Sequence, residues 1–220
     1  MPLNIAYEKF CLNVKISYSV TFKIALFIMT FNPVLLDIPE SFDSERLFIR
    51  AARPGDGAAH FAALQESHDD LRAHLADLPW VKAEASLANS EIFCRENWCR
   101  FIRREDLRFF MFSKSDASFI GSIGLHRIDW AVPKFEIGYW CRVSAQGNGY
   151  VGEAVHAITN FVIQHLAARR IEIRADDLNV SSWKVAEKAG FKLEGILRSA
   201  ARDSVSNQLK DMRIYAKVVD

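Results

Sequence analysis

Apolar and polar positions take up a regular order from Glu45 onward. Residues 46–52 alternate between the two kinds, with Leu47 and Ile49 on one face, which predicts a half-buried β-strand. Pro54 then stands where a helix can begin, since proline is tolerated in a first helical turn. Apolar residues at helical spacing predict three helices, over 54–67, 69–76 and 84–104, with Pro79 ending the second.

Three strand-like runs follow these helices. They cover residues 109–113, 119–128 and 135–142, and residues rich in turn formers separate them at 113–118 and 129–134. Because such short connections join antiparallel neighbours, we expect an antiparallel meander.

The last third of the chain alternates helices and strands. Its pattern predicts a helix over 149–168, a strand over 171–175, a helix over 181–189 that ends at Gly190, and strands over 191–197 and 210–219. Helices, a meander and then a β-α-β-α-β-β succession together predict a mixed sheet, in a fold of the α/β or α+β class.

The first 36 residues are apolar, but charges interrupt them at Glu8, Lys9, Lys15 and Lys23. No uncharged run reaches the roughly 18 to 20 residues that a membrane-spanning helix needs, so no membrane anchor is expected. The stretch 24–29 is short for the apolar part of a secretion signal. We therefore expect residues 1–28 to be a non-native or over-called extension, and residues 29–220 to form a single domain.

The charges of the chain nearly cancel. Lys and Arg number 28 and Asp and Glu 27, which leaves a net charge of +1. No strong overall field exists to attract nucleic acid or an anionic membrane, so neither is expected as a partner. The four cysteines form neither a C-x-x-C pair nor a Cys/His ligand pattern, which predicts no metal site and reduced thiols in a cytoplasmic protein. They are Cys11, Cys94, Cys99 and Cys141.

A glycine-rich turn stands between the third strand of the meander and the next helix. Gly147, Gly149 and Gly152 follow one another closely there. Glycine lets the backbone approach a ligand and adopt positive φ, while a first helical turn offers N–H groups and a partial positive charge. These properties suit a phosphate or pyrophosphate. A plain turn that uses glycine for its geometry alone is the alternative.

The same glycines also satisfy the dinucleotide pattern G-x-G-x-x-G. Glu172 lies twenty residues beyond Gly152, where such a fold keeps its ribose-binding acid. Only 68 residues follow Gly152, however, which is too few for two nucleotide-binding halves. A Walker A loop is excluded because no Gly-Lys-Ser/Thr follows, and no kinase catalytic loop is present.

The loop Gln146-Gly147-Asn148-Gly149-Tyr150 resembles the Q/R-x-x-G-x-G/A acyl-CoA loop of the GNAT superfamily of N-acetyltransferases. Three further segments are similar to that family, at 136–140, 179–182 and 186–195. The stretches 45–50 and 211–216 are similar to its ribosomal-protein-serine acetyltransferase (RimJ/RimL) group. The resemblance covers about residues 31–220 and implies the GNAT fold, a central, mostly antiparallel, twisted sheet that is splayed at the acyl-CoA site and flanked by helices.

This resemblance implies acetyl-CoA as co-substrate, with no metal, where the strand at 136–142 diverges from that at 171–175. Backbone N–H groups of the loop would hold the pyrophosphate, and main-chain groups of the first strand would pair with pantetheine and the thioester. Most members have Gly or Ala where this chain has Val151, which would shift one contact to the pyrophosphate. The implied cofactor-binding residues are Cys141, Arg142, Gln146, Gly147, Asn148, Gly149, Tyr150, Val151, Gly152 and Asn179.

Two candidate catalytic residues follow from the resemblance. Ser182 matches the family position proposed to protonate the departing thiolate, and a plain place on a helix surface is its alternative. Glu136 would draw a proton from the incoming ammonium through water, with a surface or sheet-pairing role as the alternative. Asn179 resembles the residue whose side chain contacts the pantetheine arm, with a helix N-cap as its alternative. Tyr139 could line the acyl channel, with packing as its alternative.

The expected function is transfer of an acetyl group from acetyl-CoA to a primary amine, by direct attack in a ternary complex. A protein N-terminus and a small molecule both remain open as acceptors. The group often supplies an acid between its last two strands, and the absence of a carboxylate from Arg198 to Arg202 counts against an N-terminal serine. A catalytically silent acyl-CoA sensor or scaffold is the alternative function, and a homodimer is left open.

Overall fold

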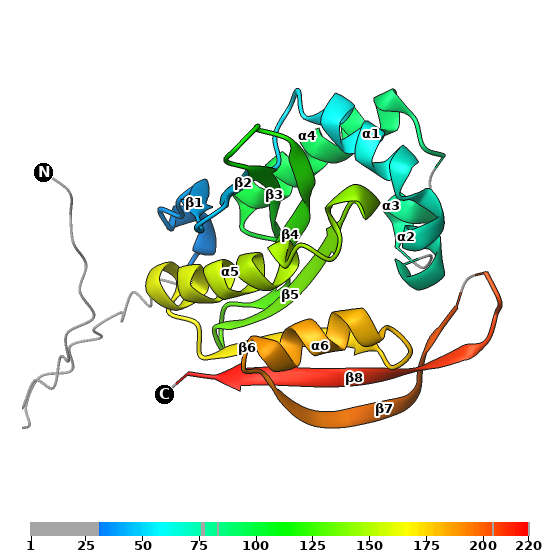
Figure 1. Ribbon diagram of the computed structural model, residues 1–220. Coiled ribbons are helices and arrows are strands. Elements are labelled where there is room, and N and C mark those ends of the chain that lie inside the picture. Colours follow the sequence, from blue (N-terminus) through cyan, green and yellow to red (C-terminus); the bar gives the residue numbers. More distant parts are fainter. Residues whose placement is uncertain (1–30, 76–77, 83, 204, 220) are drawn as a thin grey trace, which may run out of the picture. The chain divides into compact units, whose positions relative to one another are not determined.

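An eight-stranded sheet organises the described part of the chain, residues 31–75, 78–82, 84–203 and 205–219 of a computed structural model (Figure 1). Its strand order is β1-β2-β3-β4-β5-β6-β8-β7. Neighbours are antiparallel except β5 and β6, which are parallel. The strands are β1 (Ser41–Asp43), β2 (Leu47–Ala51), β3 (Leu107–Ser113), β4 (Phe119–Asp129), β5 (Lys134–Cys141), β6 (Arg170–Asp176), β7 (Lys192–Arg202) and β8 (Leu209–Val218).

Helices connect and cover these strands. They are η1 (Pro33–Leu35), α1 (Gly57–Glu66), α2 (His68–Leu75), α3 (Pro79–Lys82), α4 (Leu87–Arg103), η2 (Val143–Ala145), α5 (Tyr150–Leu166) and α6 (Val180–Lys188). Figure 1 shows α5 and α6 in front of the sheet and α1 to α4 gathered at its upper end. No described helix has the length and apolar character needed to cross a membrane.

Alternation along the strands gives the sheet two covered faces. Phe109 and Ile137 belong to the main core, with the buried side of α5, whereas Phe110 and Trp140 join a second cluster with α1, α2 and α4. Because successive residues of a strand point to opposite faces, one run of β3 serves both clusters. We call the side covered by α5 and α6 the front face and the other side the back face.

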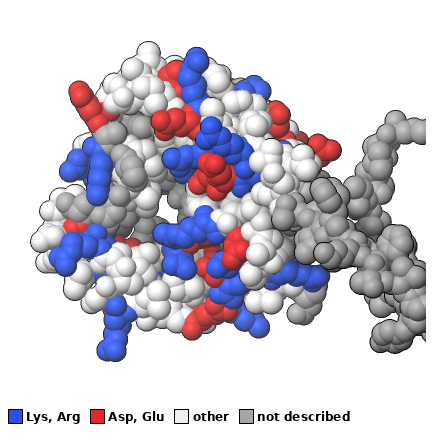
Figure 2. Space-filling view, turned by 180° about the vertical axis from the view of Figure 1, so that it is seen from behind, with Lys and Arg blue, Asp and Glu red and all other residues white. Residues whose placement is uncertain are grey.

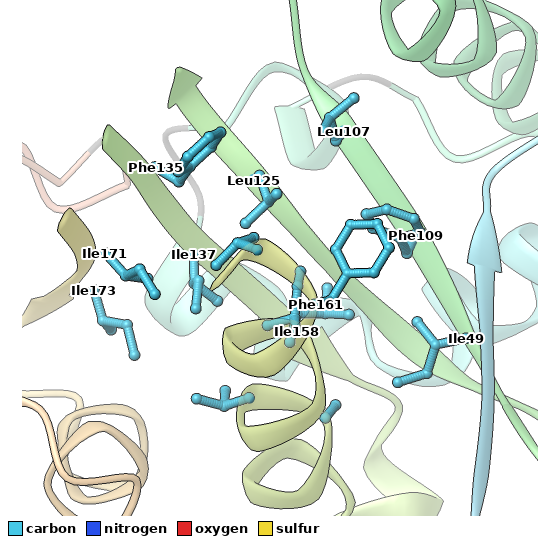
Figure 3. Close-up of a cluster of buried hydrophobic side chains, with 14 of the residues drawn as sticks. Ile49, Leu107, Phe109, Leu125, Phe135, Ile137, Ile158, Phe161, Ile171 and Ile173 are labelled. Carbon is cyan, nitrogen blue, oxygen red and sulfur yellow. The ribbon is translucent and has the colours of Figure 1, made fainter. Parts of the chain in front are cut away.

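The front-face core is built from aromatic and branched side chains. Figure 3 shows Ile158 and Phe161 of α5 pointing toward the strands that carry Phe109 and Ile49. The rings of Phe109 and Phe161 meet edge to face with centroids 5.5 Å apart, and Phe42 stacks on Phe161 at 4.6 Å. Such offset and edge contacts suit the charge distribution of aromatic rings. They fix α5, and therefore the loop before it, against the sheet.

The structure confirms the predicted mixed sheet, its meander of β3, β4 and β5, and the later helices and strands. It adds elements that the pattern did not predict, namely η1, β1, α3 and η2. Pro79 begins α3 as well as following α2, in keeping with the preference of proline for a first turn. Residues 32–220 make up one compact unit, and the expectation about residues 1–28 lies outside the described residues.

Candidate active site

The loop between β5 and α5 adopts a conformation that requires its glycines. Gly147 and Gly149 have φ angles of 75° and 78°, in the left-handed region where a side chain is strained. Gly149 is also the N-cap of α5, and no side chain caps that helix. A Cβ atom at Gly147 or at Gly152 would meet no atom within 4 Å. The outer surface of the loop is therefore open at these positions.

The N–H groups of this loop are its main chemical resource. No described residue accepts a hydrogen bond from the backbone N–H of residues 147–152, whereas the N–H of Glu153 donates to the carbonyl of Gly149 at 3.1 Å. Consecutive unpaired N–H groups at a helix N-terminus, together with the helix dipole, form a site for an anionic group. The arrangement suits a pyrophosphate.

Side chains of the loop point to the protein and leave its backbone accessible. The Asn148 amide donates to the carbonyls of Ala145 and Gln146 at 3.2 and 3.0 Å. Gln146 donates to Asp70 of α2 at 2.9 Å. Val151 packs against the front-face core, so its branched side chain does not occupy the outer surface of the loop.

A first clamp joins the loop to the turn before β2. Arg46 donates to Glu153 at 2.7 Å and to the carbonyl of Asn148 at 3.0 Å, and its guanidinium lies 4.6 Å from the ring centre of Tyr150. Ser44 donates its hydroxyl proton to Glu153 at 2.6 Å. Burial opposes ionisation, yet these hydrogen bonds hold the pKa of Glu153 below its usual value. Arg46 thus neutralises the one acid of the first turn of α5 and brings a cation beside Gly149.

A second clamp joins the loop to α1. Glu66 accepts hydrogen bonds from Arg142 Nε at 2.8 Å and from the backbone N–H of Ser144 at 2.7 Å. These bonds, with that of Arg142 first, lower the pKa of Glu66 to about 2. The guanidinium of Arg142, predicted to bind the cofactor, is therefore directed to α1.

Strands β5 and β6 diverge next to this loop. They pair in parallel from Lys134↔Arg170 to Ile137↔Ile173, and no described pair follows. Beyond this point β5 continues to Cys141 along β4, and β6 continues along β8. The predicted splay is confirmed, and it leaves the edge of β5 from Gly138 to Cys141 without a strand partner on the β6 side. Backbone N–H and C=O groups on such an edge are ready to pair with an extended ligand.

Tyr139 and Ser182 meet on the front face of this gap. The Tyr139 hydroxyl donates to the Ser182 carbonyl at 2.9 Å and accepts from the Ser182 hydroxyl at 3.2 Å. Burial raises the pKa of Tyr139 to about 12, so it stays a neutral phenol. Asn179 caps α6 by accepting from the backbone N–H of Ser182 at 3.0 Å, which confirms the capping role and leaves its amide NH₂ available.

Glu136 lies on the back face, since it is three residues from Tyr139 on the same strand. Its carboxylate accepts two hydrogen bonds from Arg127, at 2.6 and 2.5 Å, and its Oε2 lies 3.1 Å from Arg174 Nε. The neighbouring carboxylate in the parallel register is Glu172. Figure 2 shows acidic and basic side chains intermingled across this face. The structure therefore brings Ser182 to one side of the gap and Glu136 to the other.

Cysteine and metal chemistry find no support in the described residues. Burial raises the pKa of the Cys141 thiol to about 11, which makes it a poor nucleophile. Cys94, Cys99 and Cys141 are free thiols. No group of His, Cys, Asp and Glu that could hold a metal ion occurs in the part of the chain described here.

Two residues that hold the loop in place from distant parts of the chain were not predicted from the sequence. Arg46 and Glu66 hold it from both sides, and neither belongs to the glycine motif or lies near it in the chain. A lone arginine just before a strand and a lone glutamate at the end of a helix show no pattern of their own in the sequence. Their role becomes visible only when β2, α1 and the loop are assembled.

Comparison with protein families gives a match over most of the chain. The family model described as "Acetyltransferase (GNAT) domain" matches residues 46–192. The chain is 30% identical over 141 residues to a ribosomal-protein-serine acetyltransferase of Escherichia coli (strain K12), which covers 77% of that protein and 56% of this chain. It is 35% identical over 100 residues to the probable N-acetyltransferase YjcK of Bacillus subtilis (strain 168), which covers 55% of that protein and 45% of this chain.

Solved structures share the fold. The microcin C7 self-immunity acetyltransferase MccE, in complex with acetyl-CoA and AMP, superposes with a TM-score of 0.73 at 20% identity, covering 80% of this chain and 93% of that one. RimL, a ribosomal L7/L12 α-N-protein acetyltransferase in complex with coenzyme A, also has a TM-score of 0.73, at 23% identity, covering 83% of this chain and 98% of that one.

Proposed function

Since the chain belongs to the GNAT acetyltransferase family, an N-acetyltransferase family that uses acetyl-CoA, we propose that its acceptor is the α-amine at the N-terminus of a protein. One observation carries the site: the unpaired N–H groups of residues 147–152 open beside the gap between β5 and β6. The relative from Escherichia coli is named a ribosomal-protein-serine acetyltransferase, which favours a protein amine over a small-molecule amine.

The donor would bind on the front face. The N–H groups of residues 147–152 hold the pyrophosphate, and Arg46 adds a cation beside Gly149. The pantetheine arm then runs along the open edge of β5 from Gly138 to Cys141, and the free amide NH₂ of Asn179 lies at the start of α6 to meet it. An N–H group near Cys141 would stabilise the thioester oxygen as it becomes negative.

Acetyl transfer would proceed by direct attack within a ternary complex. Because the donor occupies the front face, the amine must reach the thioester from the back face, where Glu136 lies among Arg127 and Arg174. Attack forms the C–N bond, and collapse of the tetrahedral intermediate breaks the C–S bond. Ser182, hydrogen-bonded to the neutral Tyr139, gives the thiolate its proton directly or through water and regains one from the product nitrogen through solvent.

We further expect the protein to be cytoplasmic and to bind neither nucleic acid nor a membrane. Whether it forms a homodimer is a question for measurement. The near balance of charges and the free thiols support this expectation.

The decisive assay follows CoA release with a thiol reagent. Peptides that begin with Ser or Ala are compared with the same peptides blocked at the α-amine, and mass spectrometry locates the acetyl group. We expect release with the free peptides alone and acetylation at the first residue. Acetylation of lysine side chains or of small amines only would overturn the proposed acceptor. Tight binding of acetyl-CoA without release to any amine would support the sensor instead.

A further inference from the structure

The imidazole of His126 on β4 lies above two facing glycines, with the edges that carry Nε2 nearest to them. Gly124 of β4 and Gly138 of β5 are partners in the antiparallel register. A Cβ at Gly138 would lie 2.8 Å from His126 Cδ2 and 3.0 Å from Nε2, and a Cβ at Gly124 would lie 3.2 Å from Cε1 and from Nε2. A Cβ at Gly138 would force the imidazole to shift, and one at Gly124 would be in tight contact with it, so the ring occupies room that glycine leaves. Because both residues lack a side chain, the imidazole of His126 lies close to the backbone of β4 and β5.

The glycine pair lies at the point where β5 and β6 begin to diverge. Gly138 is the first residue of β5 after its last pair with β6, Ile137↔Ile173. His126 projects from the back face, opposite Tyr139 and Ser182, because its register partner Glu136 also lies there. The Cδ2–Nε2 edge of the imidazole therefore lies on the back face, over the residue of β5 at which the gap begins.

Asp106 determines the orientation of the ring. Its Oδ2 lies 2.6 Å from His126 Nδ1, and the side chains of His126 and Asp106 are 20% and 17% exposed. Burial alone would raise the pKa of Asp106, but the hydrogen bond and charge of His126, with Arg108 and Arg100, hold it below its usual value. An ionised carboxylate can only accept, so Nδ1 carries the proton and Nε2 of the neutral ring carries the lone pair.

Nε2 is available for chemistry. No described residue is hydrogen-bonded to it, while both oxygens of the neighbouring Glu136 are engaged by Arg127 and Arg174. Around the His126–Asp106 pair, Arg108 on β3 and Arg100 on α4 act on the Asp106 carboxylate, and Glu136 on β5 is the register partner of His126. Figure 2 shows this back face with its mixed charges exposed.

We propose that His126, oriented by Asp106, is the general base that takes the proton from the acceptor amine. The proposal rests on the proposed function and assigns the proton transfer to His126 in place of Glu136. Glu136 then balances the charge of Arg127 and Arg174, so that an ammonium can approach them.

The step balances in protons and electrons. The ammonium R–NH₃⁺ gives one proton to Nε2, directly or through one water, and the imidazolium later returns it to solvent. The freed lone pair of the amine attacks the carbonyl carbon, and the C–S bonding pair leaves with sulfur. The second proton of the nitrogen replaces the one that the thiolate takes. One thiol, one amide and one released proton result.

The test compares His126→Gln with His165→Gln, a matched change at an exposed histidine near the end of α5. We expect His126→Gln to keep acetyl-CoA affinity and thermal stability while kcat falls about 10²- to 10⁴-fold near pH 7. The loss should shrink toward pH 9, where more of an α-amine with a pKa near 8 is already neutral. Asp106→Asn, which removes the positioning charge, should lower kcat less and shift the pH profile.

The possible outcomes distinguish failure of the base assignment from failure of the proposed function. An inactive wild-type chain that binds acetyl-CoA would overturn both. Activity of the wild type that survives in a folded His126→Gln variant would overturn the base assignment alone. A loss equal at every pH between 6 and 9 would also overturn it, because a merely structural role predicts that result. Gly138→Ala gives a second route, since its Cβ displaces the ring without altering the histidine, and unchanged turnover there would contradict the proposal.

Discussion

The two faces of the sheet at the β5–β6 gap present different chemical groups. The front face offers backbone, with N–H groups of residues 147–152 and an open edge of β5. The back face offers side chains, with His126, Glu136 and the guanidinium groups of Arg127 and Arg174. The acetyl-CoA donor stays the same whichever amine accepts the acetyl group, and a backbone site suits a ligand that does not change. The acceptor amines differ, and single substitutions can adapt a site made of side chains to a different acceptor.

The largest effect should come from putting charge on the backbone site. Gly149→Asp places a carboxylate where a diphosphate would approach, so acetyl-CoA affinity should fall 100- to 1000-fold, or about 3 to 4 kcal/mol. Gly149→Asn is the matched control because it has the same size and tolerates positive φ without the charge. Titration calorimetry measures both. Equal affinities of the two variants would mean that no anion binds this loop.

A comparable effect is expected on the back face, where acid should lower the free energy of unfolding. His60 is 1% exposed between Phe93 and Phe110, and burial, with the charge of Arg108, lowers its pKa to about 3. The unfolded chain binds this proton below about pH 6.5 and the folded chain does not, so stability is lost as pH falls from about 6.5 to about 3. Relative to His60→Phe, the wild type should lose about 3 kcal/mol between pH 7 and pH 4.

Urea unfolding of both proteins at several pH values measures that difference. The phenylalanine ring keeps the stacking position and cannot titrate. Parallel stability curves for the two proteins would contradict the buried neutral state of His60.

A moderate effect is expected at Glu136. Its removal in Glu136→Gln leaves Arg127 and Arg174 without their shared carboxylate, and two uncompensated cations repel an incoming ammonium. We expect a roughly 10-fold rise in the acceptor KM, smaller at high salt because the repulsion is screened, and little change in kcat. Steady-state kinetics at 50 and 500 mM salt decide this. A kcat loss that recovers with rising pH would return the base role to Glu136.

The smallest effect should come from the clamp between α1 and the loop. Glu66→Gln keeps the shape but weakens the bonds to Arg142 and Ser144, and acetyl-CoA affinity should fall a few-fold. The pKa of Glu66 is lowered to about 2, so its stabilising contribution is present above about pH 4.5 and fades as pH falls toward 2. The stability gap between wild type and variant should therefore close in acid. A gap that persists at pH 2 would contradict the clamp.

The two faces also differ in how far the sequence predicts them. The glycines of the loop stand together in the chain because one turn needs them, and Asn179 and Ser182 lie in one short motif, so a pattern shows them. The back face draws Asp106, His126 and Arg174 from three separate segments of the chain, and only the pairing of β3, β4, β5 and β6 brings them to one region of the sheet. Gly124 and Gly138 leave the room that the His126 ring occupies. A glycine within a strand predicts such a site only once its partner on the next strand is known.

A crystal structure with a bisubstrate analogue tests the central claim most directly. The analogue joins the sulfur of CoA, through a two-carbon acyl bridge, to the α-nitrogen of a serine peptide. The account predicts CoA on the side of α5 and α6, with its pyrophosphate on residues 147–152 and its bridge passing between Gly138 and Arg174. The peptide should leave from the back face, with its nitrogen within hydrogen-bond or one-water reach of His126 Nε2. A peptide and a CoA moiety on the same face would contradict the account.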